Sequence, residues 1–329
     1  MKVLLFGSGP FGLPVLDCLY QNQSARHLEV LRVVTRPDRP HGRGKKVAST
    51  PVHARAQDLG LPCDAPESAQ SPEYLDLLSS LKPDLFIVID YGEILRKRLR
   101  EIPRVGVFNL HASLLPRYRG AAPIAHALLA GEKVTGVTLF RIEKGLDSGP
   151  IVDSEQVEIG PLETAGELEQ RLSRLAAQVL ERNLDAFGSG KLSQAPQDER
   201  LATFAPKLEK KMGNIDWGRS PEALTNFMRA LNPWPGAFSF LHSAGKPPER
   251  TIFLRAKPAG KRTESLSKEG SVEEVRKDGF TVRCGQGSLE PLEVQREGKA
   301  ALSAGAYLRG RALKPGDYFC SQVKTAEEE

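Results

Sequence analysis

The amino-acid sequence predicts an α/β protein, in which an open, mostly parallel sheet with helices on both faces precedes a small β-barrel domain. In the first half, continuous apolar runs such as Leu85–Ile89 alternate with helical patterns, as in parallel strands that are covered on both faces. From Ala237 onward, short β-type runs separated by Gly, Pro and Ser turns dominate, which is typical of a small barrel. The length of 329 residues suits two domains better than one.

The chain begins with a strand, a glycine-rich turn and a helix. The apolar residues 3–6 precede residues 7–12, which match the pattern G-x-G-x-x-G, and residues 13–19 read as a helix. A dinucleotide site built on this motif needs an acidic residue at the end of the second strand, Glu29–Val34. No carboxylate stands there, although Arg36 leaves a weaker case for the 2′-phosphate of NADP. We therefore interpret the motif as a tight turn and expect no NAD(P).

The remaining elements follow from hydrophobic periodicity and turn residues. Helices are predicted over residues 51–60, 72–80, 123–129, 164–187 and 221–231. Strands are predicted over residues 85–89, 106–110, 136–140, 151–157, 238–241, 251–256, 271–277, 280–283 and 290–295. The strand 151–157 is expected at a sheet edge, and Gly188 is expected to end the long amphipathic helix. These elements predict a first domain over 1–190, a linker over 191–206, a second domain over 207–318 and a charged tail over 319–329.

Positive charge gathers in the second half and in one loop of the first half. Residues 1–206 carry 25 Lys and Arg against 25 Asp and Glu, whereas residues 207–329 carry 21 against 16. The loop 36–46 has five Lys or Arg among eleven residues, and its Pro and Gly content excludes a helix or a central strand. A basic module favours a polyanionic partner, nucleic acid before membrane, with ordinary solubility charge as the alternative. The loop suits phosphate contacts or is a solvated surface loop.

Composition and cysteine usage narrow the class of protein. The chain is 40% hydrophobic and 26% charged, as in a soluble globular protein. No apolar run approaches the roughly 20 residues that are needed to span a bilayer. The four cysteines show no CxxC spacing and have no histidine clusters beside them. The sequence therefore predicts neither a disulfide framework nor a metal site, and a reducing cytosol is expected.

The chemistry is expected where the strand 106–110 ends. Successive side chains of a strand alternate between faces, so Asn109 and His111 point the same way. An amide and an imidazole side by side can hold an oxygen that gains negative charge. Asp147 adds a carboxylate from a turn between two glycines. Each residue alone is more often a cap, a structural histidine or a turn residue, but together they indicate acyl-type transfer without a nucleophilic side chain.

The motifs around these residues resemble those of the folate-dependent formyltransferases. The resemblance rests on residues 109–124, 136–138 and 145–149. Three further features are similar to the methionyl-tRNA formyltransferases within that superfamily: the loop 36–46, residues 203–207 leading to 215–217, and residues 230–237. The resemblance runs from residue 1 to about residue 318.

The resemblance implies a Rossmann-like catalytic domain followed by an OB-like barrel that binds tRNA. It also implies formyl transfer from 10-formyltetrahydrofolate to the methionine α-amine of initiator Met-tRNA, without a metal. Asn109, His111 and Asp147 would be the catalytic residues. The folate would lie near Tyr91, Gly92, Ser113, Leu114, Leu115 and Pro116. The tRNA contacts in the basic loop would come from Arg39, Arg43, Lys45 and Lys46.

Asp90 and the turn residues 8–10 depart from the usual pattern of the family, although the backbone role of that turn should survive. Relatives usually carry a small apolar residue at the position of Asp90. The sequence therefore does not predict how the protein packs against the pterin ring of the folate at this position. A rival reading is a formyltransferase acting on a small amine such as an amino-sugar nucleotide, but a small ligand needs neither basic segment. Others are an NAD(P)-dependent oxidoreductase and a catalytically silent RNA-binding protein. We expect a monomer by default. A bacterial cytosol is favoured, because a mitochondrial homologue would carry an Arg/Ser-rich leader, whereas Met1 starts the first strand here.

Overall fold

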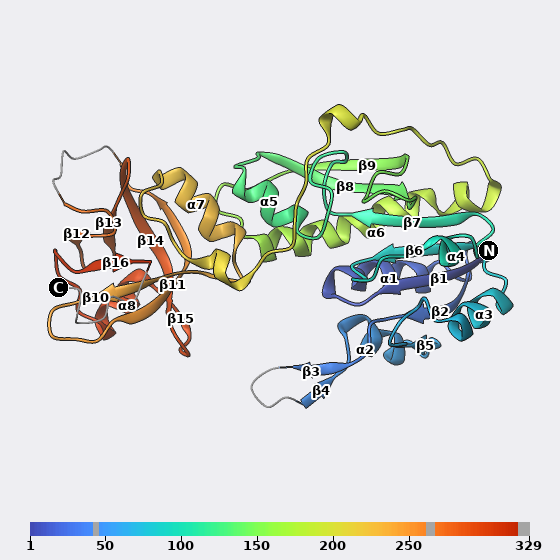
Figure 1. Ribbon diagram of the computed structural model, residues 1–329, viewed down its shortest axis with the longest axis horizontal. Helices are drawn as coiled ribbons and strands as arrows, with labels where there is room; N and C mark the ends of the chain where they lie inside the picture. Colours follow the sequence, from blue (N-terminus) through green and yellow to red (C-terminus); the bar gives the residue numbers. More distant parts are fainter. Residues whose placement is uncertain (42–45, 261–266, 322–329) are drawn as a thin grey trace. The chain divides into compact units, whose positions relative to one another are not determined.

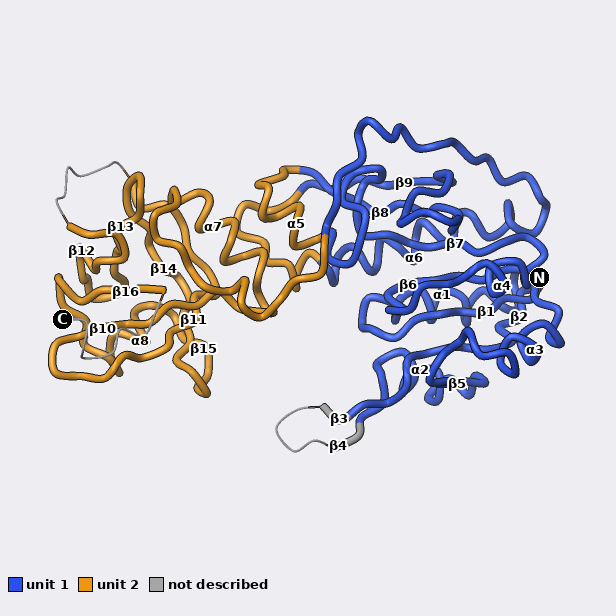
Figure 2. Tube along the Cα trace, in the orientation of Figure 1, with its two compact units in different colours: residues 1–123, 134–158, 169–205 blue, residues 124–133, 159–168, 206–329 orange. Residues whose placement is uncertain are grey.

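The computed structural model describes residues 1–41, 46–260 and 267–321. The chain divides into two compact units (Figure 2). Unit 1 comprises Met1–Pro123, Val134–Glu158 and Glu169–Ala205, and unit 2 comprises Ile124–Lys133, Ile159–Leu168 and Pro206–Glu329. Two short segments from the first half of the chain thus cluster with the second half. Among the described residues, no helix combines the length and the apolar character that crossing a membrane requires.

Unit 1 is built on a seven-stranded sheet in the order β5-β2-β1-β6-β7-β8-β9 (Figure 1). Its strands are β1 (Lys2–Gly7), β2 (Glu29–Val34), β5 (Cys63–Asp64), β6 (Leu85–Ile89), β7 (Gly106–His111), β8 (Val134–Arg141) and β9 (Ile151–Glu158). The pairs from β5 to β7 are parallel, whereas β8 runs antiparallel to both β7 and β9. The sheet is therefore mostly parallel, and β9 forms its edge, as the sequence predicted.

Helices alternate with these strands along the chain. They are α1 (Leu13–Gln21), α2 (Pro51–Asp58), α3 (Pro72–Ser80), α4 (Lys97–Arg100), α5 (Pro123–Leu129) and α6 (Ala165–Ser189). Two of them begin with the same device, a hydroxyl cap followed by proline at the first helical position. Thr50 accepts a hydrogen bond from the backbone N–H of His53, and Ser71 accepts one from that of Tyr74. The sequence pattern Ser/Thr-Pro therefore fixes where these helices start.

The end of α6 differs from its prediction. Gly188 was expected to end the helix, but the helix continues through it to Ser189. The backbone turns left-handed only at Gly190, whose φ is +68°. A residue with positive φ after the last helical turn is what ends a helix, and glycine adopts it without strain. Of two nearby glycines, the sequence does not say which one takes that conformation.

The basic loop of unit 1 is rooted in a small hairpin. β3 (Arg39–His41) and β4 (Lys46–Ala48) form a separate two-stranded antiparallel sheet. Figure 1 shows this hairpin projecting beyond α2. It does not enter the central sheet, which agrees with the exclusion of a helix or central strand from residues 36–46.

Unit 2 contains an antiparallel, nearly closed sheet in the order β12-β13-β14-β11-β10-β16, with β15 paired to β14. Its strands are β10 (Ala237–His242), β11 (Glu249–Pro258), β12 (Val272–Val275), β13 (Phe280–Cys284), β14 (Gly287–Arg296), β15 (Ala301–Ser303) and β16 (Tyr318–Cys320). An isolated bridge between Ser271 and Tyr318 joins the two ends of the order. The predicted barrel is confirmed, and β16 extends two residues into the segment assigned to the tail.

Two helices complete unit 2. α7 (Pro221–Ala230) precedes the first barrel strand, and α8 (Ala304–Gly310) lies between the last two. Ser220 caps α7 by accepting a hydrogen bond from the backbone N–H of Ala223, again with proline at the first helical position. The sequence predicted α7 but missed α8, a seven-residue helix that lacks a proline at its start.

Candidate active site

Strand β7 carries two of the predicted catalytic residues to the carboxyl end of the sheet. It lies between β6 and β8, with Asn109 opposite Val88 and His111 opposite Thr138. Asn109 and His111 are two positions apart, so their side chains leave the strand on the same face. Ligands of open α/β sheets bind outside the carboxyl ends of the strands. The position of both residues therefore fits a ligand site.

His111 is held by a backbone carbonyl on one side and faces a carboxylate on the other. The residue is 6% exposed, and its Nε2 lies 2.9 Å from the carbonyl oxygen of Tyr118. A carbonyl only accepts, so Nε2 carries a proton in this arrangement. Nδ1 lies 3.8 Å from Oδ2 of Asp147, which is longer than a hydrogen bond. Nδ1 is therefore the ring nitrogen that remains for a reacting group.

Asp147 lies in the turn between β8 and β9. Its φ is +47°, a left-handed conformation that is uncommon for residues other than glycine. Its Oδ2, the oxygen that faces His111, accepts a hydrogen bond of 2.8 Å from the backbone N–H of Gly120. The structure thus brings the distant Asp147 to His111, as the predicted constellation requires.

The amide of Asn109 is half-buried at the same end of β7. Within residues 1–41, 46–260 and 267–321, no hydrogen-bond partner of this side chain is recorded. Most buried side-chain amides are satisfied inside a protein. An amide that is ready to donate beside an imidazole is the arrangement that binds a developing oxyanion.

The loop that follows β7 was predicted to hold the folate. Ser113 is fully buried, and its hydroxyl donates a hydrogen bond of 2.6 Å to the carbonyl of Arg117. Thr138 Oγ1 donates to the Ser113 carbonyl at 2.7 Å and accepts from the Leu115 N–H at 3.1 Å. Leu114 and Pro116 are half-buried. The Ser113 hydroxyl is thus used internally, and a ligand would meet the backbone and the half-buried side chains of this loop.

The turn after β6 was the second predicted folate segment. The Tyr91 side chain is 2% exposed and packs edge-on against Phe6, with ring centroids 5.3 Å apart. Burial raises the pKa of the Tyr91 hydroxyl. Gly92 is exposed, with a φ of +79°. A ligand at this turn would therefore meet its backbone and Gly92 rather than the phenol ring of Tyr91.

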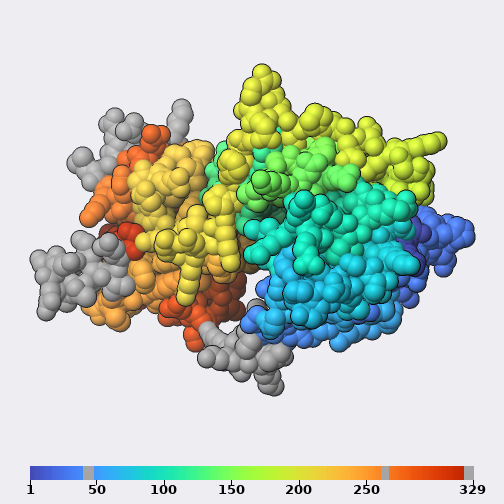
Figure 3. Space-filling view, turned by 45° about the vertical axis from the view of Figure 1, so that its right-hand side comes forward, coloured from blue at the N-terminus to red at the C-terminus, as the bar shows by residue number. Residues whose placement is uncertain are grey.

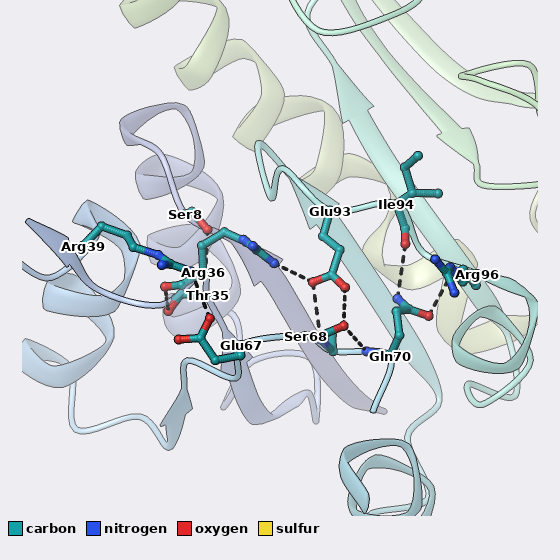
Figure 4. A network of polar contacts seen from close by, with 11 residues as sticks. Ser8, Thr35, Arg36, Arg39, Glu67, Ser68, Gln70, Glu93, Ile94 and Arg96 are labelled. Carbon is teal, nitrogen blue, oxygen red and sulfur yellow. Dashed lines mark hydrogen bonds and ion pairs between the residues drawn. The ribbon is translucent and has the colours of Figure 1, made fainter. Parts of the chain in front are cut away.

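A polar network fixes this turn to the root of the basic loop (Figure 4). Glu93 accepts a hydrogen bond of 2.7 Å from Arg36 Nη1 and one of 2.7 Å from Ser68 Oγ. The backbone N–H of Arg36 donates to the hydroxyl of Ser8 in the first glycine turn, at 2.9 Å. The guanidinium group of Arg36, which was a candidate to bind the 2′-phosphate of NADP, is thus paired with Glu93.

Two of the four predicted tRNA residues lie in the described part of the chain, on the two strands of the hairpin. Arg39 belongs to β3 and pairs with Glu67 at 2.9 Å, with both side chains exposed. Lys46 begins β4. Arg43 and Lys45 lie outside the described residues. Arg39 and Lys46 thus belong to the paired strands of the hairpin, and Arg39 is engaged with Glu67 rather than with a residue near His111.

One segment near the site had no role in sequence analysis. Residues 191–206 were interpreted as a linker, but Gln197 donates hydrogen bonds to the carbonyl oxygens of Asp147 and Gly149. Gln197 also accepts from Arg119. These residues are separated by 48 to 78 positions in the chain. No local pattern in the sequence indicates such a connection.

Asp90, the residue that departs from the family pattern, lies at the end of β6 with a φ of +47°. A Cβ atom added to Gly9 would lie 1.7 Å from Asp90 Oδ2, so the carboxylate occupies the space that this glycine leaves. The residue is exposed to solvent. Nevertheless, desolvation by the atoms packed around its carboxyl group and the negative charge of Glu169 raise its pKa from 3.8 to about 6.

We expect Asp90→Asn to stabilise the protein at neutral pH but not at acidic pH. Between pH 4 and 6 the unfolded state releases the Asp90 proton before the folded state does, so stability falls as pH rises through this window. Asparagine has the same shape and does not ionise. The difference in melting temperature between variant and wild type should be small at pH 4 and largest above pH 7. An equal difference at both pH values would contradict the raised pKa.

Comparisons with known proteins agree with the predicted family and fold. Residues 1–184 match the family described as formyl transferase, and residues 207–312 match the formyl transferase C-terminal domain. A methionyl-tRNA formyltransferase of Geobacter metallireducens is 41% identical, over 96% of this chain and 97% of its own length. One from Parvibaculum lavamentivorans is 43% identical, over 96% of this chain and 99% of its own length.

Solved structures share the fold at lower identity. WlaRD, a sugar 3N-formyl transferase whose structure was determined with dTDP and 5-N-formyl-THF, is 17% identical, with a TM-score of 0.63. That match covers 91% of this chain and 99% of WlaRD. The fold and the family matches together define an α/β enzyme of the group-transfer class. The matches in both halves establish that the chain belongs to the formyl transferase family.

Proposed function

We propose that this enzyme transfers the formyl group of 10-formyltetrahydrofolate to the methionine α-amine of initiator Met-tRNA, in the bacterial cytosol. The observation that carries the chemistry is the convergence of Asn109, His111 and Asp147 at the carboxyl end of β7. The acceptor is supported by relatives near 40% identity that span both halves of the chain and are named methionyl-tRNA formyltransferases.

The reaction needs stabilisation of an oxyanion rather than an activated nucleophile. The α-amine attacks the formyl carbon, a C–N bond forms, and the formyl oxygen gains negative charge. The Asn109 amide and Nδ1 of His111 are the two donors for that oxygen. Because Nε2 is tied to Tyr118, Nδ1 donates only when the ring is protonated. The Asp147 carboxylate lies 3.8 Å from that nitrogen and faces the ring.

Collapse of the tetrahedral intermediate requires one proton to leave the amine and one to reach the folate. The bond between the formyl carbon and folate N10 breaks, and N10 takes up a proton. Asp147 or an ordered water accepts the proton of the amine. An α-amine has a reference pKa of about 8, so part of it is neutral at physiological pH and attacks without a nucleophilic side chain.

We place the folate against the turn at Tyr91 and Gly92 and the loop over residues 113–116. Both segments follow adjacent parallel strands, β6 and β7, and so lie at the carboxyl end of these strands, where Asn109 also lies. Such an arrangement would bring a bound donor next to the Asn109 amide. The solved HypX structure from Aquifex aeolicus, which shares this fold at 17% identity and a TM-score of 0.60, contains tetrahydrofolic acid.

The basic loop distinguishes tRNA from a small acceptor. Arg39, Arg43, Lys45 and Lys46 place four positive charges within eight residues of the sequence, and phosphate contacts supply much of the affinity for nucleic acids. A small amine such as an amino-sugar nucleotide would require neither this loop nor a basic second domain. The direct test is formyl transfer from 10-formyltetrahydrofolate to charged initiator tRNA and, separately, to an amino-sugar nucleotide. Activity on the sugar alone would reject the tRNA assignment.

We expect Arg43→Ala to lower kcat/KM for Met-tRNA by roughly 10-fold while leaving the Kd for the folate unchanged, because one phosphate contact is worth about 1 kcal/mol or more. The variant should also show a weaker dependence of tRNA affinity on salt concentration. Arg98→Ala removes the same charge from an exposed position on α4 and serves as the matched control. Equal losses in both variants would mean that the loop has no special role.

A further inference from the structure

We infer that Gln197 and Arg119 are positioning residues that hold the Asp147 turn in its reactive geometry. This inference rests on the proposed formyl transfer and extends it to residues outside the Asn109, His111 and Asp147 set. Gln197 belongs to the segment 191–205, which lies at the surface of unit 1 (Figure 3). Its side chain is half-buried, whereas residues 193–196 just before it are exposed.

The Gln197 amide bridges the Asp147 turn and Arg119. Its Nε2 donates to the carbonyl oxygen of Asp147 at 2.8 Å and to that of Gly149 at 2.7 Å. Its Oε1 accepts from Nε of Arg119 at 3.1 Å and from Nη2 of Arg119 at 2.7 Å. Both donors and both lone pairs of the amide are therefore used. A side chain held at both ends has one orientation.

Arg119 fixes the orientation of Gln197 in turn. The residue is 3% exposed, and its guanidinium pairs with Glu199 through two bonds of 2.8 Å each. Its backbone N–H donates to the Thr203 carbonyl at 2.9 Å, and its own carbonyl accepts from the Ala205 N–H at 2.7 Å. The bidentate pair between Arg119 and Glu199 fixes the plane of the guanidinium group, and this also fixes the positions of the two nitrogens that donate to Gln197.

The Asp147 turn is thus secured from two sides. The backbone N–H of Gly120, the residue after Arg119, donates to Asp147 Oδ2, whereas Gln197 binds the backbone on both sides of Ser148. No other donor to the carbonyl oxygens of Asp147 and Gly149 is recorded in the described part of the chain. Asp147 adopts a positive φ, which persists only where the surroundings enforce it. Without Gln197, the carboxylate would leave its place beside His111.

The substitution Gln197→Glu separates the two halves of this bridge. A glutamate still accepts from Arg119, but it cannot donate and it repels the two carbonyl oxygens. We expect kcat with Met-tRNA to fall by about 10- to 100-fold, with the KM for tRNA and for the formyl donor changed by less than about threefold. Gln197→Ala, which can neither donate to the two carbonyl oxygens nor accept from Arg119, should lower kcat by a similar factor. Gln194→Glu makes the same change at an exposed position of this segment and should keep the wild-type kcat.

A double-mutant cycle with Asp147→Asn tests positioning against a purely structural role. If Gln197 acts through the Asp147 carboxylate, Gln197→Glu should lower kcat by less than about threefold further once that carboxylate is gone. A structural role would lower kcat by the same factor in both backgrounds. Melting temperatures show whether each variant folds. If Gln197→Glu does not fold, Gln197→Ala takes its place in the double-mutant cycle.

Two results would overturn the inference, and they differ from failure of the proposed function. Wild-type kcat in Gln197→Glu, or equal factors in both backgrounds, rejects the positioning role while the chemistry stands. Wild-type kcat in Asp147→Asn rejects the catalytic role of Asp147 and, with it, the positioning role. Absence of formyl transfer to Met-tRNA by the wild type rejects the proposed function itself.

Discussion

Asn109→Ala is expected to lower kcat for formyl transfer by about 10²–10³-fold, because one of two donors to the developing oxyanion is lost. The interaction forms in the transition state, so the KM values for tRNA and folate should change little. Single-turnover kinetics with saturating 10-formyltetrahydrofolate and Met-tRNA measure the chemical step directly. A kcat within about threefold of the wild-type value would show that Asn109 does not bind the oxyanion.

Asn109 makes the cleaner test because its removal should cost the fold little. Its amide has no recorded hydrogen-bond partner among the described residues, so alanine breaks no internal bond there. His111, in contrast, contacts the Tyr118 carbonyl and lies edge-on to the ring of Phe140. A loss of activity in Asn109→Ala with an unchanged melting temperature therefore reports on the reaction rather than on folding.

Gly149→Ala is expected to damage the site through the backbone. A Cβ atom at this buried position would lie 1.8 Å from the carbonyl oxygen of Arg141 in β8, so strand and turn must move apart. Overpacking of this kind costs about 1–3 kcal/mol of unfolding free energy. A shift of the turn by about 1 Å can lower kcat by roughly 10²-fold, because it displaces Asp147 from His111. Denaturant unfolding and steady-state kinetics measure the two effects separately.

Gly188→Ala provides the matched control for this substitution. Gly188 lies inside α6, and nothing is within 4 Å of the position that its Cβ would take. Alanine is favoured over glycine by roughly 0.5–1 kcal/mol in the middle of a helix and by less in the last turn, so this variant should keep or slightly gain stability and keep its kcat. If Gly149→Ala retained both wild-type stability and kcat, the contact between the turn and β8 would be looser than the structure shows.

The main elements of the fold followed from sequence because their signals are local. The apolar run Leu85–Ile89 needs both faces covered, and it is a fully buried strand beside β1 and β7. Pro72 and Pro221 each follow a serine that caps a helix. Short structures without such signals, among them β3, β15 and α8, were not predicted.

The signal for the proposed catalytic pair on β7 was equally local, but the surroundings of the other predicted site residues were not. Asn109 and His111 share a face because the strand period is two. The burial of the Tyr91 ring, and the internal use of the Ser113 hydroxyl, depend on neighbours that lie far away or on loop geometry. Both side chains are of a type that could contact a ligand. The structure shows that the Tyr91 ring packs inside the protein and that the Ser113 hydroxyl already forms a hydrogen bond.

The sequence by itself determined the two-part architecture, the mostly parallel sheet and the strand that carries Asn109 and His111, because each depends on periodicity or spacing within a few residues. Only the tertiary structure decided that Asp147 lies 3.8 Å from His111 and that Gln197 and Arg119 hold its turn. These contacts join residues 36 to 78 positions apart, and they form only when the strands pair and the loops close over them. Hydrogen bonds across such distances depend on the folded backbone, and a pattern of neighbouring residues does not encode them.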